Sequence, residues 1–127
     1  MKDTKKKLLE SGEMYLETIL ILSHKLENVR SIDISEYRSF SKPSVSRAVN
    51  LLKDNGYIII DDQTGYITLT PSGKEVAEKI YERHQILTQV LTRMGVDPKI
   101  AEDDACRIEH VISDETFETI KKHMESH

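Results

Sequence analysis

The 127-residue sequence contains a single cysteine, no tryptophan and no long apolar run. Cys106 alone cannot form an internal disulfide bond. The apolar runs reach only four residues, as in Ile19–Leu22, whereas a membrane-spanning helix needs roughly 20. The N-terminus is charged and lacks the apolar stretch of a secretory signal peptide. These absences favour a soluble protein of the reducing cytoplasm, with no membrane partner.

The sequence also has no overall excess of basic residues, because its formal net charge is −4. Taken alone, this acidity argues mildly against a nucleic-acid partner, since phosphate contacts need Lys and Arg. The two halves differ, however. Residues 1–60 contain ten Lys or Arg and eight Asp or Glu, whereas residues 61–127 contain eight and fourteen. A slightly basic half joined to an acidic half is compatible with DNA contact at one end and cation binding at the other.

The first half of the sequence predicts three helices. Apolar residues at helical spacing indicate a helix from about Lys5 to Leu26. The short, mixed segment Ile32–Phe40 predicts a helix of about two turns. Ser41-Lys42-Pro43 begins a third helix with a capping hydroxyl and an early proline, and Gly56 follows its end.

The second half predicts a β-hairpin followed by three more helices. Two strand-like runs, residues 57–61 and 66–70, flank a turn-like segment. Capping residues and a closing glycine then delimit helices expected at residues 70–94, 97–112 and from 113 onward. Helix, short helix, capped helix and hairpin is the element order of a winged helix-turn-helix. We therefore expect a mainly α fold with a small β-hairpin, in which a winged helix-turn-helix precedes a helical region.

The third helix presents a polar outward face. Val45, Val49 and Leu52 form its inward apolar stripe. On the outward stripe, Arg47 suits a guanine edge and Asn50 an adenine edge. A polar helix face is often merely solvated, so the order of the elements is what favours DNA binding. The expected DNA-binding residues are Ser41, Lys42, Pro43, Ser44, Ser46, Arg47 and Asn50 in the helix, with Thr64 and Tyr66 in the hairpin.

Three metal-capable side chains stand close together near the C-terminus. Cys106, Glu109 and His110 are spaced i, i+3 and i+4, so one helix would project all three from one face. Alone this pattern is weak, because a buried cysteine usually acts as a small hydrophobe. Further metal-capable residues on earlier helices are Met14, Glu17 and His84. Three helices converging on one cation is the hypothesis that this distribution favours.

Several runs along nearly the whole chain resemble one known family. They are residues 13–19, 43–46, 69–74 and 82–84, and the most specific, Asp104-Ala105-Cys106-Arg107-Ile108-Glu109-His110-Val111-Ile112-Ser113-Asp114. In these runs the chain resembles the diphtheria-toxin-repressor family of iron- and manganese-dependent transcriptional regulators. The resemblance implies a cytoplasmic, metal-activated repressor that controls metal homeostasis, not an enzyme. Its implied partners are double-stranded operator DNA and a second copy of the chain, with no organic substrate.

The resemblance also implies domains and ligands. It divides the chain into a DNA-binding domain, residues 1–72, and a metal-binding and dimerisation domain, residues 73–127. The matching positions of the regulatory metal site are Met14, Cys106, Glu109 and His110, with Glu17 and His84 as ligands of a second or binuclear site and Glu102 as a further iron-type ligand. Thr88 stands where iron-type members have a carboxylate, which argues against an iron-type ancillary site.

The identity of the metal rests on two opposed features. The thioether of Met14 and the thiolate of Cys106 are soft ligands, which disfavour hard Mn²⁺ and favour Fe²⁺. The end of the chain near His127 leaves no room for the additional C-terminal domain of many iron-type members, and Glu17 resembles the manganese-type site. We give the ligands more weight and expect Fe²⁺ over Mn²⁺, with Co²⁺, Ni²⁺ or Zn²⁺ able to substitute in vitro.

Ligands from distant helices suggest how a metal would act. A metal that holds the DNA-reading half against the dimerising half would fix the distance between the two recognition helices of a dimer. That distance must be about 34 Å, or a multiple of it, to match successive major grooves. The expected dimer surface follows Gly95 and contains Ile100, Val111, Ile112, Phe117 and Ile120.

Three other functions remain as alternatives. A metal-independent winged-helix regulator would sense a small ligand or an oxidant through Cys106. An enzyme would use Cys106 as a nucleophile activated by His110, but no oxyanion site or orienting third group accompanies them. A passive metal-binding protein would bind metal and ignore DNA.

Overall fold

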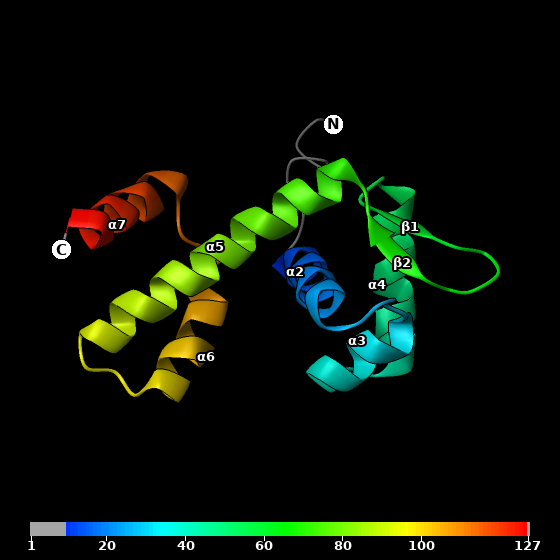
Figure 1. Cartoon of the computed structure of the whole chain (residues 1–127), viewed down its shortest axis with the longest axis horizontal. Helices are drawn as coiled ribbons and strands as arrows, with labels where there is room; N and C mark the ends of the chain where they lie inside the picture. Colours follow the sequence, from blue (N-terminus) through cyan, green and yellow to red (C-terminus); the bar gives the residue numbers. More distant parts are fainter. Residues whose placement is uncertain (1–9, 127) are drawn as a thin grey trace. The chain divides into compact units, whose positions relative to one another are not determined.

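The computed structural model describes residues 10–126 as six helices and one two-stranded sheet, shown in Figure 1. The mainly helical fold with a small β-hairpin is as the sequence predicts. The chain divides into two compact units, Met1–Glu78 and Lys79–His127. No helix within residues 10–126 is long and apolar enough to cross a membrane.

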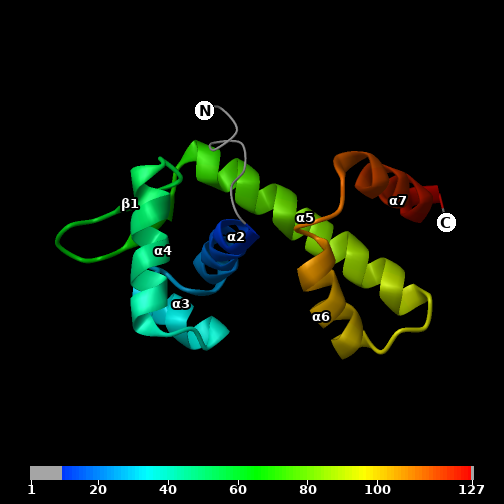
Figure 2. The same cartoon turned by 180° about the vertical axis from the view of Figure 1, so that it is seen from behind.

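The first unit is a winged helix-turn-helix. It contains α2 (Glu10–Lys25), α3 (Ser31–Arg38), α4 (Lys42–Asp54) and the antiparallel strands β1 (Ile58–Ile60) and β2 (Ile67–Leu69). Figure 2 shows the loop between the strands extending beyond α4. The core of this unit is made of one apolar face from each element, namely Leu16, Ile19, Ile34, Val45, Val49, Leu52, Ile58 and Ile67.

Local sequence signals define the recognition-helix candidate, α4. The hydroxyl oxygen of Ser41 accepts a hydrogen bond from the backbone N–H of Ser44 at 3.3 Å, and a proline lies in the first turn. Beyond the last turn, Gly56 takes a left-handed conformation with a φ of 82°. The predicted cap, proline and closing glycine therefore all occur at this helix.

The hairpin is fastened to the start of α5 (Pro71–Arg93) by a close backbone approach. The hydroxyl of Thr70 donates to the carbonyl oxygen of Gly56 at 2.7 Å and accepts from the N–H of Gly73 at 3.1 Å. A Cβ atom at Gly73 would overlap the carbonyl oxygen of Tyr57. Glycine at position 73 is what lets the first turn of α5 lie against the strand.

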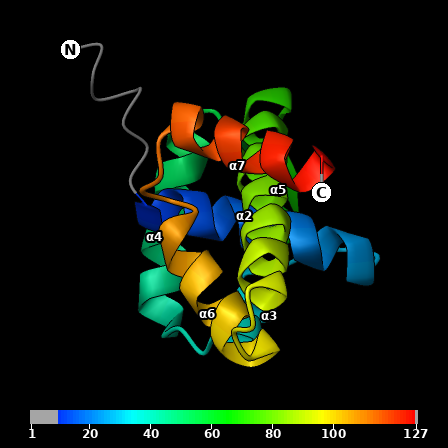
Figure 3. The ribbon, with the colours of Figure 1, turned by 90° about the vertical axis from the view of Figure 1, so that its left-hand side faces the viewer.

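The second unit is helical. It contains the remainder of α5, together with α6 (Pro98–Ile108) and α7 (Asp114–Ser126), and Figure 3 shows both later helices beside α5. The carboxylate of Asp97 caps α6 by accepting from the N–H groups of Lys99 and Ile100. Its core residues are Ile80, Leu87, Ala101, Ala105 and Phe117.

One expected helix boundary differs from the structure, and another lies outside the described residues. The helix expected to run to about Ile112 ends at Ile108, so Glu109 and His110 lie in the turn that follows α6. Cys106, Glu109 and His110 therefore do not all project from one regular helix, as the spacing alone suggested. The first helix is described from Glu10, and the expected start near Lys5 lies outside the described residues.

Candidate functional site

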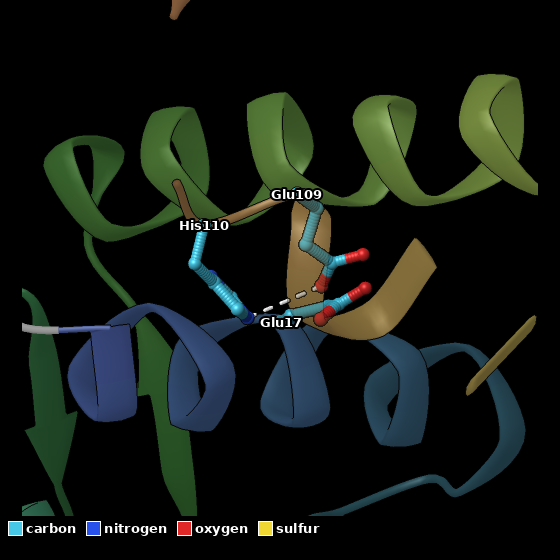
Figure 4. A group of neighbouring side chains, drawn as sticks. All are labelled: Glu17, Glu109 and His110. Atoms are coloured by element: carbon cyan, nitrogen blue, oxygen red, sulfur yellow. Dashed lines mark ion pairs between the residues drawn. The ribbon is translucent and has the colours of Figure 1, made fainter. Parts of the chain in front are cut away.

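A buried carboxylate lies between two histidines in the second unit. Nδ1 of His84, on α5, is 2.9 Å from Oε1 of Glu109. Nε2 of His110 is 3.3 Å from Oε2 of the same carboxylate, the ion pair drawn as a dashed line in Figure 4. Glu109 is fully buried, and a buried carboxylate is costly unless positive charge or hydrogen bonds compensate it.

One oxygen of the buried Glu109 carboxylate lacks a hydrogen bond within the described residues. Oε2 of Glu109 is buried and accepts no hydrogen bond from residues 10–126. Carboxylate oxygens and imidazole nitrogens are ligands that divalent transition metals bind. The residues around Glu109 therefore fit a bound cation, since a cation would give this buried oxygen the partner that no hydrogen bond provides.

Arg83 holds the turn that carries these side chains. Its guanidinium is buried and donates from Nη1 to the carbonyl oxygens of Glu109, at 3.0 Å, and Ile112, at 2.7 Å. Nη2 donates to the carboxylate of Asp114 at the start of α7, and the guanidinium lies 5.4 Å from the ring centre of Phe117. Arg83 thus ties α5 to the end of α6 and to α7 through the backbone of the turn.

Two other expected ligands of the second unit lie on α6. Glu102 is exposed, and its Oε2 is 3.7 Å from Nε2 of His84. Cys106 is half-buried, about one turn before Glu109. The structure therefore brings His84 together with Glu102 and Glu109, and places the Cys106 thiol on the same segment of chain.

The first unit contributes the remaining expected ligands from α2. Glu17 is 1% exposed and is labelled in Figure 4, while Met14 is half-buried one turn earlier. Nη2 of Arg38, at the end of α3, is 3.9 Å from Oε1 of Glu17. Nε of Arg38 donates to the hydroxyl of Thr18, the residue after Glu17, at 2.8 Å, and that hydroxyl donates to the carbonyl oxygen of Met14 at 2.8 Å.

The expected DNA-binding residues of α4 form one exposed face. Exposed side chains there are Lys42, Pro43, Ser46, Arg47 and Asn50, with Ser41 exposed at the cap and Ser44 half-buried. The Ser41 hydroxyl donates to the Ser44 hydroxyl at 2.9 Å, and Nδ2 of Asn50 donates to the Ser46 carbonyl at 2.9 Å.

The charge of Arg47 also acts on a neighbouring residue of α2. Burial raises the pKa of the Tyr15 phenol, and the positive charge of Arg47 opposes that rise.

The expected wing residues lie between the strands. Thr64 is exposed, and its hydroxyl accepts from the N–H of Tyr66 at 3.2 Å. The guanidinium of Arg30 is 5.1 Å from the ring centre of Tyr66. Next to it, the N–H of Ile67 donates to the carbonyl of Val29 at 2.7 Å, which fastens the wing to the segment before α3.

Sequence reasoning missed the two arginines that support the site. One signal could have identified Arg83, because it occupies a place in the apolar stripe of α5 between Ile80 and Leu87, where a charge needs buried partners. No comparable signal marked Arg38. Its role follows from the packing of α3 on α2, which spacing along the sequence does not reveal.

Comparison with known proteins decides the family. A model of the iron dependent repressor N-terminal DNA-binding domain matches residues 7–66, and a model of the iron dependent repressor metal-binding and dimerisation domain matches residues 70–126. The chain belongs to the iron-dependent repressor family. Membership makes it a transcriptional regulator rather than an enzyme, with a DNA-binding part followed by a metal-binding and dimerisation part.

The chain is similar to several named regulators along most of its length. The chain is 33% identical over 113 residues to the transcriptional regulator MntR of Salmonella typhimurium, covering 89% of this chain and 71% of that protein. It is 31% identical to the diphtheria toxin repressor of Corynebacterium diphtheriae, covering 92% of this chain and 52% of that protein. The structure of the manganese regulator SloR matches with a TM-score of 0.78 and 29% identity over 90% of this chain, which spans about half, 53%, of the SloR chain.

Proposed function

We propose that the chain is a repressor that binds operator DNA as a homodimer when loaded with a divalent metal. The buried Glu109 carboxylate between His84 and His110 carries this proposal, at 2.9 Å and 3.3 Å from their nitrogens. A structural ion pair alone would leave a buried oxygen of Glu109 without a hydrogen bond. Family membership supports the same assignment.

The proposed ligands come from both units. From the second unit they are His84, Glu102, Cys106, Glu109 and His110, and from α2 of the first unit they are Met14 and Glu17. The positive charge of a bound metal would compensate the negative charge of these carboxylates. The metal would also favour the arrangement of the chain in which both sets of ligands can bind it. Glu102 is the weakest member, because its exposed side chain would have to become ordered.

We further propose that Fe²⁺ is favoured over Mn²⁺. The thioether of Met14 and the thiolate of Cys106 are softer than carboxylates, and soft ligands disfavour Mn²⁺. Because most nitrogen, oxygen and sulfur sites bind Fe²⁺ more tightly than Mn²⁺, the useful quantity is how the ratio of the two affinities changes when one ligand is replaced.

On the DNA side, α4 enters the major groove and the hairpin contacts the backbone. Arg47 and Asn50 are exposed on the face of α4 and offer the hydrogen-bond geometries for guanine and adenine edges. The apolar residues Ile100 and Val111, 54% and 66% exposed, lie on the part of the chain that the second copy would cover. The dimer would thereby present two copies of α4 to successive major grooves.

The direct test is an anaerobic pull-down of sheared genomic DNA by the purified protein, in excess chelator, with Fe²⁺ or with Mn²⁺. Recovery of the same fragments only with metal is the expected result. Equal recovery in chelator would remove metal as the switch and favour a metal-independent winged-helix regulator. Metal binding without selective recovery of any DNA would favour a passive metal-binding protein.

Metal preference is tested on the same protein with Cys106→Glu, which exchanges a soft for a hard ligand. The ratio of Fe²⁺ to Mn²⁺ affinity, measured by competition with a chelating fluorophore, is expected to fall. The control is Glu115→Gln, on an exposed side chain of α7. An unchanged ratio in Cys106→Glu would remove the thiolate from the proposed ligand set.

A further inference from the structure

Arg38 connects the candidate metal ligands of α2 to the turn that precedes the recognition helix, and all the contacts lie within the first unit. Its guanidinium approaches α2 at two adjacent residues. Nε donates to Thr18 Oγ1 at 2.8 Å, and Nη2 is 3.9 Å from Oε1 of Glu17. Both partners on α2 are buried, with exposed fractions of 0% and 1%, so the contact is shielded from water.

Thr18 extends this connection to the other candidate ligand of α2. Its hydroxyl accepts from Arg38 and donates to the carbonyl oxygen of Met14 at 2.8 Å. A hydroxyl that both donates and accepts has its orientation fixed by the two bonds. Arg38 is therefore linked to Glu17 directly and to the helical turn of Met14 through one hydrogen bond.

The other end of Arg38 is the turn between α3 and α4. Arg38 is the last residue of α3, and Ser41, three residues later, caps α4. Between them Ser39 adopts a left-handed conformation with a φ of 60°, and the carbonyl of Phe40 accepts from the hydroxyl of Ser35 at 2.6 Å. This turn has little freedom to move independently of α3.

A second contact fastens the same turn to α2. The rings of Phe40 and Tyr15 pack with centres 5.3 Å apart, and Tyr15 lies between Met14 and the residues that Arg38 contacts. Phe40 and Arg38 thus contact α2 on both sides of Glu17, at Tyr15 and at Thr18. A shift of this part of α2 cannot leave the turn unaffected, because packed groups move together.

We propose that Arg38 is a positioning residue that couples metal binding at Met14 and Glu17 to the placement of α4, an inference that rests on the proposed function. When the site lacks metal, the guanidinium compensates the buried carboxylate of Glu17. When a cation binds the Glu17 carboxylate, that carboxylate attracts the Arg38 guanidinium less strongly. Arg38 and the α3–α4 turn that follows it then change position. Coupling of this kind is reciprocal, so DNA bound at α4 also raises the affinity of the metal site.

The test measures the ratio of DNA affinity in saturating metal to DNA affinity in chelator. This ratio measures the coupling between metal binding and DNA binding. Fluorescence anisotropy is recorded with a DNA fragment recovered by the metal-loaded wild-type protein, in chelator and in saturating Mn²⁺. The test variants are Arg38→Met, which removes charge and donors but keeps an apolar stem, and Thr18→Val, which removes the acceptor and leaves Arg38 in place. Thermal melting in chelator verifies that each variant folds.

Lys25→Met is the matched control. Its ammonium lies 5.3 Å from the ring centre of Tyr37, as does the Arg38 guanidinium, but it is exposed on the last turn of α2. The control therefore removes a positive charge and a cation–ring contact from the same neighbourhood while leaving the Thr18 and Glu17 contacts intact.

The expected result is that the ratio falls about tenfold in Arg38→Met, falls less in Thr18→Val and does not change in Lys25→Met. An unchanged ratio in both test variants would overturn the proposal. So would an equal loss of DNA affinity with and without metal in Arg38→Met, because that result describes a phosphate contact and not coupling. If the wild-type protein itself shows a ratio of one, the proposed function fails before the role of Arg38 is reached.

Discussion

The Arg83 guanidinium donates a hydrogen bond of 3.0 Å to the backbone carbonyl oxygen of Glu109. The adjacent residue on α5, His84, contacts the carboxylate of the same glutamate at 2.9 Å. Two consecutive residues of one helix therefore fix both the backbone and the side chain of Glu109. The sequence alone predicts that Glu109 belongs to the helix of Cys106. In the structure, α5 fixes the position of the Glu109 carboxylate as much as α6 does.

Replacing Arg83 by Met is expected to weaken metal binding. The substitution removes both carbonyl contacts, so the turn of Glu109 and His110 loses its restraint, and metal affinity should fall by about 10- to 100-fold. Loss of the donor to the buried carbonyl oxygen of Glu109 should also lower the free energy of unfolding by about 1–3 kcal/mol.

The measurement for Arg83→Met is chelator competition for Mn²⁺, with urea unfolding to follow stability. Lys79→Met is the control, since Lys79 contacts only the exposed end of the same network, at Asp114. Wild-type metal affinity in a folded Arg83→Met protein would contradict the role assigned to Arg83.

The pH dependence of Asp114 is a second expectation. A hydrogen bond from the Lys79 ammonium, then the charges of Lys79 and Arg83, hold the pKa of Asp114 below its ordinary value of 3.8. Because the folded-state pKa is depressed, the stabilising contribution of this carboxylate is present above the unfolded-state value of about 3.9 and is lost as pH falls through the folded value.

Asp114→Asn should therefore be less stable than wild type above about pH 4, and the two should converge at lower pH. Thermal melting as a function of pH measures this, and Glu115→Gln on the next residue is the control. A carboxyl NMR titration that gives Asp114 a pKa above 3.8 would contradict the account.

Gly73→Ala is expected to destabilise the winged helix. The added Cβ would overlap the carbonyl oxygen of Tyr57, so the first turn of α5 and the hairpin must move apart. Overpacking of this kind costs about 1–3 kcal/mol, measured as a lower urea midpoint. Ser72→Ala, on an exposed neighbouring residue, should change little. Equal midpoints for Gly73→Ala and wild type would refute the close approach.

Arg47→Ala is expected to weaken binding to metal-selected DNA. Loss of a bidentate base contact costs about 1–3 kcal/mol and relaxes preference at one base pair. Anisotropy at fixed salt, with the selected fragment and point-mutated versions of it, separates base contact from phosphate contact. Lys99→Ala, an exposed residue of α6, is the charge-matched control. A uniform loss on every fragment would assign Arg47 to the phosphate backbone instead.

The winged helix-turn-helix could be predicted because its signals are local. The cap at Ser41, the glycine at 56 and the inward residues Val45, Val49 and Leu52 all depend on neighbours within the same helix, and all occur as expected. The two strand-like runs, residues 57–61 and 66–70, likewise predicted the strands, which the structure shortens to Ile58–Ile60 and Ile67–Leu69.

The candidate site could be predicted in part. The residue types near Glu109 were identifiable from spacing and resemblance, but the end of α6 at Ile108 was not. Arg83, 26 positions away in sequence from Glu109, binds the carbonyl oxygens of Glu109 and Ile112 in the chain that follows the helix. Contacts at this separation leave no periodic signal. The same reason hid Arg38, which is 20 positions from Thr18.

The central claim is that a metal held at Glu109 controls DNA binding, and one comparison tests it most directly. DNA affinity of wild type and Glu109→Gln is measured in chelator and in saturating metal, with Glu115→Gln as the control. The amide retains an oxygen for His84 but is a poor metal ligand. The account predicts that metal raises the affinity of wild type and Glu115→Gln by about tenfold or more, and leaves Glu109→Gln at its chelator value. An equal response to metal in all three proteins would contradict it.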